Sequence, residues 1–167
     1  MKETGYNVGP AQQERIMQVH FNLEDGTLVN SHVQVPPTGN TVYGGTHGLF
    51  SSTEDFLKFC QMILNKGSFN GHSILKKETV ELMIRNHVGE LIGPGRGFGL
   101  GFGVLYDTDK DPSPASTGQV YWGGYFKTHF FIDPKEDLIG IIMTQKIPNT
   151  DEYIIELNRA VYSALSL

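Results

Sequence analysis

The sequence has a single cysteine, no excess of basic residues and no long apolar run. Cys60 stands alone, which excludes an internal disulfide and a zinc site built from several cysteines. The net charge is −5 and the basic residues are scattered, which argues against a nucleic-acid partner. No apolar stretch is long enough to cross a bilayer, and the start, MKETGYNVGP, lacks the apolar centre of a signal peptide. We therefore expect neither a nucleic-acid nor a membrane partner, and the localisation stays open.

Motifs for cofactors and metals are also missing. The glycine-rich segment GPGRGFGLGFG contains neither Gly-x-Gly-x-x-Gly nor a Gly-Lys-Ser/Thr ending, so it does not predict a phosphate site. Asp107, Asp109 and Asp111 begin like a calcium loop. However, Pro112 stands where the tight turn needs glycine, and Gly118 stands where a bidentate glutamate is required. The six histidines show no ligand spacing. We expect no cofactor and no metal site.

The length of 167 residues suits one domain with a sizeable core. Residues 1–90 are expected to be mostly helix and loop, and residues 91–167 to form an antiparallel sheet followed by a C-terminal helix. The first short helix starts near Pro10 and carries Ile16, Met17 and Val19. A turn at Asp25-Gly26 predicts a small hairpin.

Two further helices are predicted before residue 90. In SSTEDFLKFCQMILNKG, Ser51 and Glu54 form a capping-box pattern and Gly67 ends the helix. Its apolar face consists of Phe56, Phe59, Cys60, Ile63 and Leu64. An Asn70-Gly71 turn follows. The segment KKETVELMIRNH then places Val80, Met83, Ile84 and His87 on one side of a helix.

Three antiparallel strands and a helix are expected in the second part. GFGLGFGVLY alternates glycine with large apolar residues, which predicts one strand with an open face. Residues 120–132 are the second strand, and the apolar segment 138–145 is a third strand buried on both faces. Asn149 with Glu152 caps a final helix. Its apolar stripe consists of Ile154, Leu157, Val161 and Leu165. The predicted fold class is α+β.

The second strand contains the step Trp122-Gly123-Gly124. Two adjacent glycines discard side-chain packing in a strand, so they mark a place where another backbone or a ligand approaches closely.

Several blocks together resemble the C-terminal half of the serine β-lactamase-related hydrolases, which include class C β-lactamases, penicillin-binding-protein-like enzymes and their esterase relatives. In chain order the blocks are MKETGYNV, GLFSSTEDFLKFCQMILNKG, GFGLGFGV, WGGYFKTHFFIDPKEDLIGIIMTQ and the closing helix. The resemblance implies the C-terminal part of the β-lactamase/transpeptidase-like fold. It also implies acyl-transfer hydrolysis of β-lactam, ester or amide-like compounds, with a small acyl substrate as partner.

The same resemblance implies that the catalytic residues lie outside this chain. Family members carry a nucleophilic serine in a Ser-x-x-Lys helix, a Tyr-x-Asn or Ser-x-Asn loop and a Lys-Thr-Gly strand. The first two motifs belong to the half that this chain lacks, so we expect no catalytic residue here and no activity from the chain alone. As an alternative, the chain is a non-catalytic module that binds a small molecule or peptide in the remaining cleft.

Substrate-binding residues follow from the esterase-like branch, in which Trp-Gly-Gly replaces Lys-Thr-Gly. The resemblance implies that Trp122, Gly123 and Gly124 line the acyl site, and that the backbone N–H of Tyr125 is an oxyanion donor. His47, in VYGGTHGLF, stands where the family has a plainer glycine run. It either contacts a ligand or caps a turn.

Two short motifs imitate a complete site. Ser73 and Lys76 match Ser-x-x-Lys, but they follow the Asn70-Gly71 turn rather than lying inside a helix, so we interpret the match as chance. Lys127-Thr128-His129 resembles Lys-Thr-Gly without its glycine, and we interpret it as alternating strand positions. Cys60 lies on an apolar helix face and is expected in the core.

The resemblance also has a consequence for assembly. In the family, the strand that matches 138–145 pairs on its far side with a strand of the other half. Here that edge would be bare, and an open apolar edge favours association. We expect a homodimer through strand 138–145.

Overall fold

The computed structural model describes residues 1–33, 35–147 and 150–165. In chain order its elements are α1 (Pro10–Gln13), β1 (His20–Asn22), β2 (Leu28–Asn30), α2 (Thr53–Leu64), β3 (Ser68–Phe69), β4 (His72–Ser73), α3 (Lys77–Met83), β5 (Arg96–Phe98), β6 (Gly103–Leu105), β7 (Val120–Gly123), β8 (His129–Asp133), β9 (Leu138–Ile142), β10 (Lys146–Ile147) and α4 (Glu152–Leu165). This combination of helices and mainly antiparallel strands is the α+β class that the sequence predicts.

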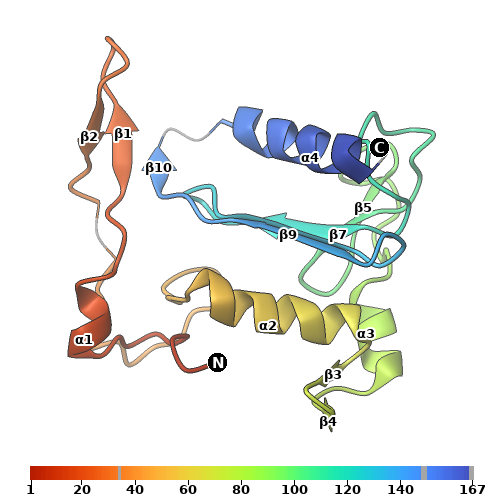
Figure 1. The fold of residues 1–167 in the computed structure, drawn as a ribbon, viewed down its shortest axis with the longest axis horizontal. Helices are drawn as coiled ribbons and strands as arrows, with labels where there is room; N and C mark the ends of the chain where they lie inside the picture. The colour runs from red at the N-terminus through yellow and green to blue at the C-terminus, as the bar shows by residue number, and fades with distance from the viewer. Residues whose placement is uncertain (34, 148–149, 166–167) are drawn as a thin grey trace.

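A five-stranded antiparallel sheet forms the centre of the protein, in the order β5-β6-β7-β8-β9. Figure 1 shows α2 on one side of this sheet and α4 on the other. Because successive residues of a strand point to opposite faces, Phe130 and Ile132 pack on the α2 side. Phe131, between them, packs on the α4 side. Phe131 and Ile132 are fully buried, so β8 runs through the middle of the core.

The structure corrects the expected three-stranded sheet, because two of the predicted strands are hairpins. Residues 120–132 divide into β7 and β8, which pair antiparallel, and GFGLGFGVLY divides into β5 and β6. β5 and β6 pair with Arg96 opposite Leu105. Gly101 has φ of 96°, a left-handed conformation that favours glycine and helps to reverse the chain. A Cβ at position 99 would lie 2.1 Å from the Met83 carbonyl oxygen, so Gly99 lets the turn lie against the end of α3. The glycine spacing thus reflects a turn and a close contact.

β9 lies at an edge of the central sheet, as the expected open edge of 138–145 requires, but it is not buried on both faces as the sequence predicted. In the described part of the chain β9 pairs with β8 alone, and its five residues are all only partly buried. The chain then leaves this sheet, and β10 pairs in parallel with β1, which pairs with β2. The outer edge of β9 therefore carries no further strand within the described residues.

Helix α2 matches the prediction except at its first residue. The N-cap is Ser52 and not Ser51, and the Ser52 Oγ accepts a hydrogen bond from the Asp55 N–H at 3.3 Å. The predicted apolar face packs against the central sheet. Gly67 has φ of 99° and follows the helix as predicted.

The first and third helices are shorter than predicted. α1 is one turn of four residues, so Ile16, Met17 and Val19 all follow it. His87 lies beyond α3, where its N–H donates to the Phe98 carbonyl at 2.8 Å. No helix within the described ranges is long and apolar enough to cross a membrane.

Part of the predicted stripe on α4 packs against the sheet. Leu157 and Val161 contact the cluster around Phe131, while Leu165 is 51% exposed. The predicted cap, Asn149, lies outside the described residues.

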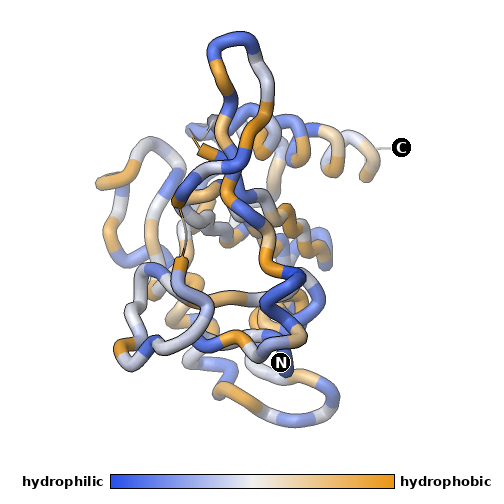
Figure 2. The backbone as a smooth tube through the Cα atoms, turned by 90° about the vertical axis from the view of Figure 1, so that its left-hand side faces the viewer, coloured by the Kyte–Doolittle hydropathy of each residue, from blue (hydrophilic) through white to orange (hydrophobic). Residues whose placement is uncertain are grey.

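Both predicted turns close hairpins. Gly26, with φ of 84°, lies in the β1–β2 connection, and Asn70 and Gly71, with φ of 49° and 77°, form the β3–β4 connection. Figure 2 views the molecule from the β1–β2 side and shows that hairpin projecting away from the rest of the chain, with a hydrophilic tip.

Candidate functional site

A cleft of about 800 Å³ lies where three separate parts of the chain meet. One wall comes from the N-terminal segment 2–17, and the second is the loop 44–53. The third wall is the end of β7 with the following turn and the start of β8, together with Met143 and Gln145. The cleft is therefore built partly from the segments that the sequence associated with an acyl site.

All five residues predicted to bind substrate line this cleft. Trp122, Gly123, Gly124 and Tyr125 come from the third wall, and His47 comes from the loop 44–53. Trp122 is 46% exposed and Tyr125 is 74% exposed, so both side chains are accessible to a ligand. The fold brings two segments that are distant in sequence to one surface.

The two glycines lie where the returning strand of their own hairpin comes close. The Gly124 N–H donates to the Thr128 carbonyl at 2.8 Å, and the Lys127 N–H donates to the Gly124 carbonyl at 2.9 Å. A Cβ at position 124 would lie 2.4 Å from the Thr128 Oγ1, and one at 123 would lie 3.1 Å from the Thr128 carbonyl oxygen. The backbone that approaches these glycines is therefore the returning strand of the same chain.

The turn after the glycines is held in place by residues that follow β9. Lys127 has φ of 65°, a conformation that costs a non-glycine residue about 1–3 kcal/mol unless its surroundings enforce it. The Thr144 hydroxyl lies 2.7 Å from the Lys127 carbonyl oxygen and 3.1 Å from that of Phe126. The Lys146 N–H also donates to the Phe126 carbonyl, and the Lys127 ammonium pairs with Asp151. These contacts fix the turn that carries the predicted oxyanion donor.

Trp122, the only tryptophan of the chain, has support on one side. Its ring meets the ring of Phe98 edge to face, with the centroids 4.8 Å apart. This contact orients the indole while nearly half of the residue stays exposed.

His129 lines the same cleft, although the sequence placed it only as a strand position. It lies on β8 opposite Gly123, and a Cβ at 123 would come 3.7 Å from its Nδ1. Burial lowers the pKa of His129 to about 4, with Asp151 opposing and Lys127 reinforcing that shift. The ring is therefore uncharged at neutral pH. The sequence could have placed His129 beside the glycines only through the pairing register of β7 and β8. That register depends on the length of the turn between them.

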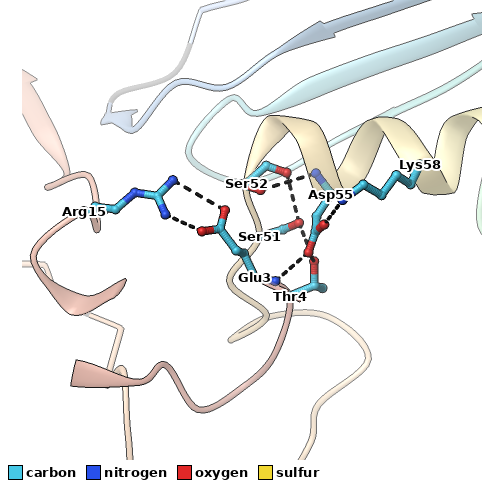
Figure 3. A network of polar contacts seen from close by, with 7 residues as sticks. All are labelled: Glu3, Thr4, Arg15, Ser51, Ser52, Asp55 and Lys58. Atoms are coloured by element: carbon cyan, nitrogen blue, oxygen red, sulfur yellow. Dashed lines mark hydrogen bonds and ion pairs between the residues drawn. The ribbon is translucent and has the colours of Figure 1, made fainter. Parts of the chain in front are cut away.

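Figure 3 shows the polar network that fixes the N-terminal wall around Asp55. Asp55 is 2% exposed, and its Oδ2 accepts from the Glu3 N–H at 2.6 Å and from the Thr4 hydroxyl at 3.2 Å. Its Oδ1 lies 2.6 Å from the Lys58 ammonium. The Lys58 contact, followed by the Glu3 and Thr4 contacts, lowers the pKa of Asp55 to about 2 against the cost of burial. At neutral pH Asp55 is thus a carboxylate that holds the N-terminal segment against α2.

The loop with His47 is held by tyrosines. The Tyr6 hydroxyl donates to the Gly44 carbonyl at 2.5 Å, and the rings of Tyr6 and Tyr43 lie 5.0 Å apart. His47 is exposed, and its Nδ1 lies 3.0 Å from the Thr46 Oγ1. Both interpretations of His47 thus have an observation behind them, because it lines the cleft and also bonds within its own loop.

The Ser73 and Lys76 match has the wrong local structure for a nucleophile. Ser73 is exposed on β4, and its Oγ donates to the Leu75 carbonyl at 3.4 Å. Lys76 is the N-cap of α3. The two residues therefore do not share the helical turn that would let the lysine activate the serine, and Ser73 is not among the cleft residues.

The structure also places the other residues that the sequence analysis singled out. Cys60 is fully buried, and burial raises the pKa of its thiol to about 12, which confirms the predicted core position. Asp111 pairs with Arg96. Lys127 and Thr128 lie in the turn before β8, so the interpretation of Lys127-Thr128-His129 as alternating strand positions is wrong for these two residues. Lys127 does not line the cleft. Within the described ranges, no group of three or more His, Cys, Asp or Glu side chains is arranged to hold a metal ion.

Comparisons with known proteins agree with this architecture. Protein Rv1367c of Mycobacterium tuberculosis is 29% identical over 164 residues, which cover 89% of this chain and 41% of that protein. The D-alanyl-D-alanine-carboxypeptidase/endopeptidase AmpH of Escherichia coli is 24% identical over 154 residues, or 90% of this chain and 37% of AmpH. The structure of EstCE1, a hydrolase with promiscuous acyltransferase activity, matches with a TM-score of 0.81 at 22% identity, over 95% of this chain and 46% of EstCE1.

The chain thus spans less than half the length of these three relatives. The structural match shows that its fold is the β-lactamase/transpeptidase-like fold expected from the sequence blocks. The family model described as Beta-lactamase matches residues 1–162, nearly the whole chain. This protein therefore belongs to the Beta-lactamase family.

Proposed function

We propose that this chain supplies the acyl-binding wall of a serine-hydrolase site that acts on β-lactam, ester or amide-like compounds. The observation that carries the proposal is the common cleft lined by Trp122, Gly123, Gly124, Tyr125 and His47. The N–H of Tyr125 lies in a turn held by Thr144, which follows β9, and by Asp151, which precedes α4, and an oxyanion donor needs such a fixed position. Trp122 offers an apolar face to the acyl group.

The nucleophile in this proposal comes from a segment outside these 167 residues. The only Ser-x-x-Lys of the sequence is Ser73 to Lys76, which lies in a strand and a helix cap away from the cleft. A hydroxyl attacks an acyl carbon efficiently only when a base removes its proton. The chain by itself is then inactive and contributes binding and oxyanion stabilisation.

An activity assay tests whether the acyl-binding wall and the nucleophile come from separate segments. The purified chain is assayed with a chromogenic β-lactam and a short-chain nitrophenyl ester, alone and mixed with a separately produced segment of a family relative that carries its Ser-x-x-Lys helix. We expect no turnover alone, turnover in the mixture, and loss of that turnover with Trp122→Ala. Turnover by the chain alone that Ser73→Ala abolishes would overturn the proposal. A mixture that stays inactive while the cleft still binds acyl compounds favours the non-catalytic binding module.

We also propose that two copies of this chain associate through β9. The supporting observation is that no strand of the described ranges pairs with the outer edge of β9, whose residues Leu138–Ile142 are partly exposed and mostly apolar. Sedimentation equilibrium at rising protein concentration should show a dimer. Ile142→Lys should weaken it by charge repulsion at the edge, whereas Leu91→Lys, at a residue that is 83% exposed outside β9, should not. A monomer at all concentrations contradicts this proposal.

A further inference from the structure

The segment 36–50, which carries His47 to the cleft, contributes no side chain to the core. None of its residues is buried, and Val42 and Tyr43 are 82% and 65% exposed. Among the described residues, every hydrogen bond that leaves this segment ends on segment 5–8. A segment held mainly by a few hydrogen bonds opens more easily than one held by packing. The position of His47 therefore depends on how this segment is joined to segment 5–8.

Two anchors join the segment to the N-terminal wall, one at each end. At the later anchor, the Phe50 N–H donates to the Gly5 carbonyl at 2.9 Å, and the Gly5 N–H donates to the Phe50 carbonyl at 3.0 Å. At the earlier anchor, the Val8 N–H donates to the Pro37 carbonyl at 2.7 Å. Loop 41–49 lies between the two anchors, so its course is set at these two points.

Asn40 completes the earlier anchor. Its side-chain amide donates to the carbonyls of Tyr6 and Pro36, at 2.7 and 2.8 Å. Its backbone N–H donates to the Asn7 Oδ1 at 2.9 Å, and its backbone carbonyl accepts from the Asn7 Nδ2 at 3.0 Å. These hydrogen bonds fix the direction in which the chain enters loop 41–49.

Loop 41–49 has little of its own to resist a shift at Asn40. Three of its nine residues are glycine, and a Cβ at Gly45 would have no atom within 4 Å outside the neighbouring residues. The ring and hydroxyl of Tyr6 contact this loop from the N-terminal wall. Glycine-rich backbone changes conformation at little steric cost. A change at Asn40 is therefore passed along the loop to His47.

Resting on the proposed function, in which His47 lines the acyl cleft, we infer that Asn40 is a positioning residue. Its hydrogen bonds set where loop 41–49 places His47 relative to Trp122, on the other side of the cleft. Asn40 is not among the residues that line the cleft, so it acts through the loop and does not touch a ligand.

Energy transfer from the single tryptophan measures this placement without a ligand or a nucleophile. A dansyl acceptor is attached to Gly45→Cys, where the side chain has free space, and Trp122 is the donor. Cys60 does not react with the label, because it is fully buried and burial raises the pKa of its thiol to about 12. We expect Asn40→Asp to lower the transfer efficiency, because an aspartate cannot donate to the two carbonyls and the loop moves away from Trp122.

Amide exchange measured by NMR locates the change. The Val8 amide bonds to the earlier anchor, so it should exchange about tenfold faster or more in Asn40→Asp. The Glu3 amide is held by Asp55 and should not change. The amides of β8 should keep their protection, because segment 36–50 adds nothing to the core.

Three further variants separate the lost hydrogen bonds from the added charge. Asn22→Asp adds the same charge at an exposed position on β1 and should alter neither the transfer nor the exchange. Asn40→Ala removes both amide donors without adding charge, so it should lower the transfer as Asn40→Asp does. Asn7→Asp keeps the acceptor for the Asn40 N–H and loses the donor to the Asn40 carbonyl, so its effect should be smaller.

Activity gives an independent readout where the mixture with the serine-bearing segment turns over. Asn40→Asp should then raise KM several-fold and leave kcat unchanged, because a displaced loop weakens binding. Equal transfer in Asn40→Asp and Asn22→Asp overturns the inference, as does an unchanged KM. Loss of protection in β8 together with Val8 also overturns it, because Asn40 would then support the whole fold. The proposed function fails in another way, namely when the transfer falls as expected but the mixture shows no turnover.

Discussion

The two main walls of the cleft are held in place by different kinds of interaction. The wall with Trp122 grows from a sheet whose central side chains, such as Phe131 and Ile132, are fully buried. The facing wall belongs to residues 1–50, and among the described residues of that segment Val19 alone is buried. One wall is therefore stabilised by packing, and the other by hydrogen bonds and ion pairs. This difference implies that pH and salt act on one wall far more than on the other.

Both regions contain an aspartate network, but the two networks differ in exposure. Asp133 is fully buried, and its Oδ2 accepts from the Tyr162 hydroxyl at 2.6 Å; the Gln119 amide donates to the same hydroxyl at 2.8 Å. In the network of Asp55, the Lys58 side chain is 40% exposed. Water can replace lost partners at an exposed site but not at a buried one. The network under α4 should therefore be the costlier one to break.

Removal of the central aromatic ring should have the largest effect. Phe131 lies against Tyr162 with ring centroids 5.9 Å apart, and its ring occupies the place that a Cβ of residue 140 would take. We expect Phe131→Ala to lower the free energy of unfolding by about 3–5 kcal/mol, measured by denaturation in urea. Leu91→Ala, at an exposed position, should stay within about 0.5 kcal/mol. Equal losses in the two variants would show that the sheet is not the packed region.

The elements that the sequence predicted correctly are those decided by local pattern. The face of α2 follows from the spacing of its apolar residues, and its end follows from Gly67. The β5–β6 hairpin was missed because alternation of period two fits one strand as well as two strands joined by a turn. The contact between Gly99 and the Met83 carbonyl favours the hairpin. It joins two different elements, so the local sequence pattern does not reveal it.

The residues of the candidate site also fall into those that the sequence pointed out and those that it missed. The Trp-Gly-Gly step stood out by its adjacent glycines, and His47 stood out by its departure from the family pattern. The structure places them on one cleft, although their binding role stays a prediction. The N-terminal wall was missed because its position depends on the contact of the Glu3 N–H with Asp55, 52 residues away. His129 was missed because its place depends on the strand register. Long-range hydrogen bonds and register are therefore what the sequence left undecided.

Loss of the buried hydroxyl under α4 should have the next largest effect. Tyr162→Phe leaves Asp133 and Gln119 each without one partner in a region closed to water. We expect the free energy of unfolding to fall by about 1–3 kcal/mol. Tyr43→Phe, at a residue that is 65% exposed, should change it by less than about 0.5 kcal/mol. Similar values for the two variants would mean that burial does not distinguish the networks.

Neutralisation of Asp55 should release the N-terminal wall while the sheet stays folded. Asp55→Asn removes the charge that draws Lys58 and the Glu3 N–H together. We expect faster amide exchange at Glu3 and its neighbours, with protection in β8 unchanged, as measured by NMR. Asp25→Asn is the matched control, because the Asp25 carboxylate contacts Thr27 within its own hairpin. Exchange that accelerates equally in β8 would contradict the separation of the two walls.

Lowering the pH should also release the N-terminal wall of the native protein, because it protonates Asp55. The pKa of Asp55 in the folded state is about 2, below the ordinary value of 3.8, so the carboxylate contributes stability that is fully present above about pH 4. That contribution is lost progressively as the pH falls from about 4 towards 2. The chemical shift of the Glu3 amide should report this titration and should lose it in Asp55→Asn. A titration that persists in the variant would assign the effect to another carboxylate.

The smallest effect should come from the exposed ion pair of the N-terminal wall. The Arg15 side chain is 62% exposed and that of Glu3 is 32% exposed, so water and salt compete with their contact. We expect Arg15→Gln to accelerate exchange at the Glu3 amide less than Asp55→Asn does, and the difference from the native protein to fade as NaCl is raised from about 0.05 M to about 1 M. Arg159→Gln removes an ion pair with Glu156 on α4, in which the arginine is exposed to the same degree as Arg15, and it should leave the Glu3 amide unchanged at all salt concentrations. A larger effect for Arg15 than for Asp55 would mean that surface charge, and not the buried carboxylate, positions this wall.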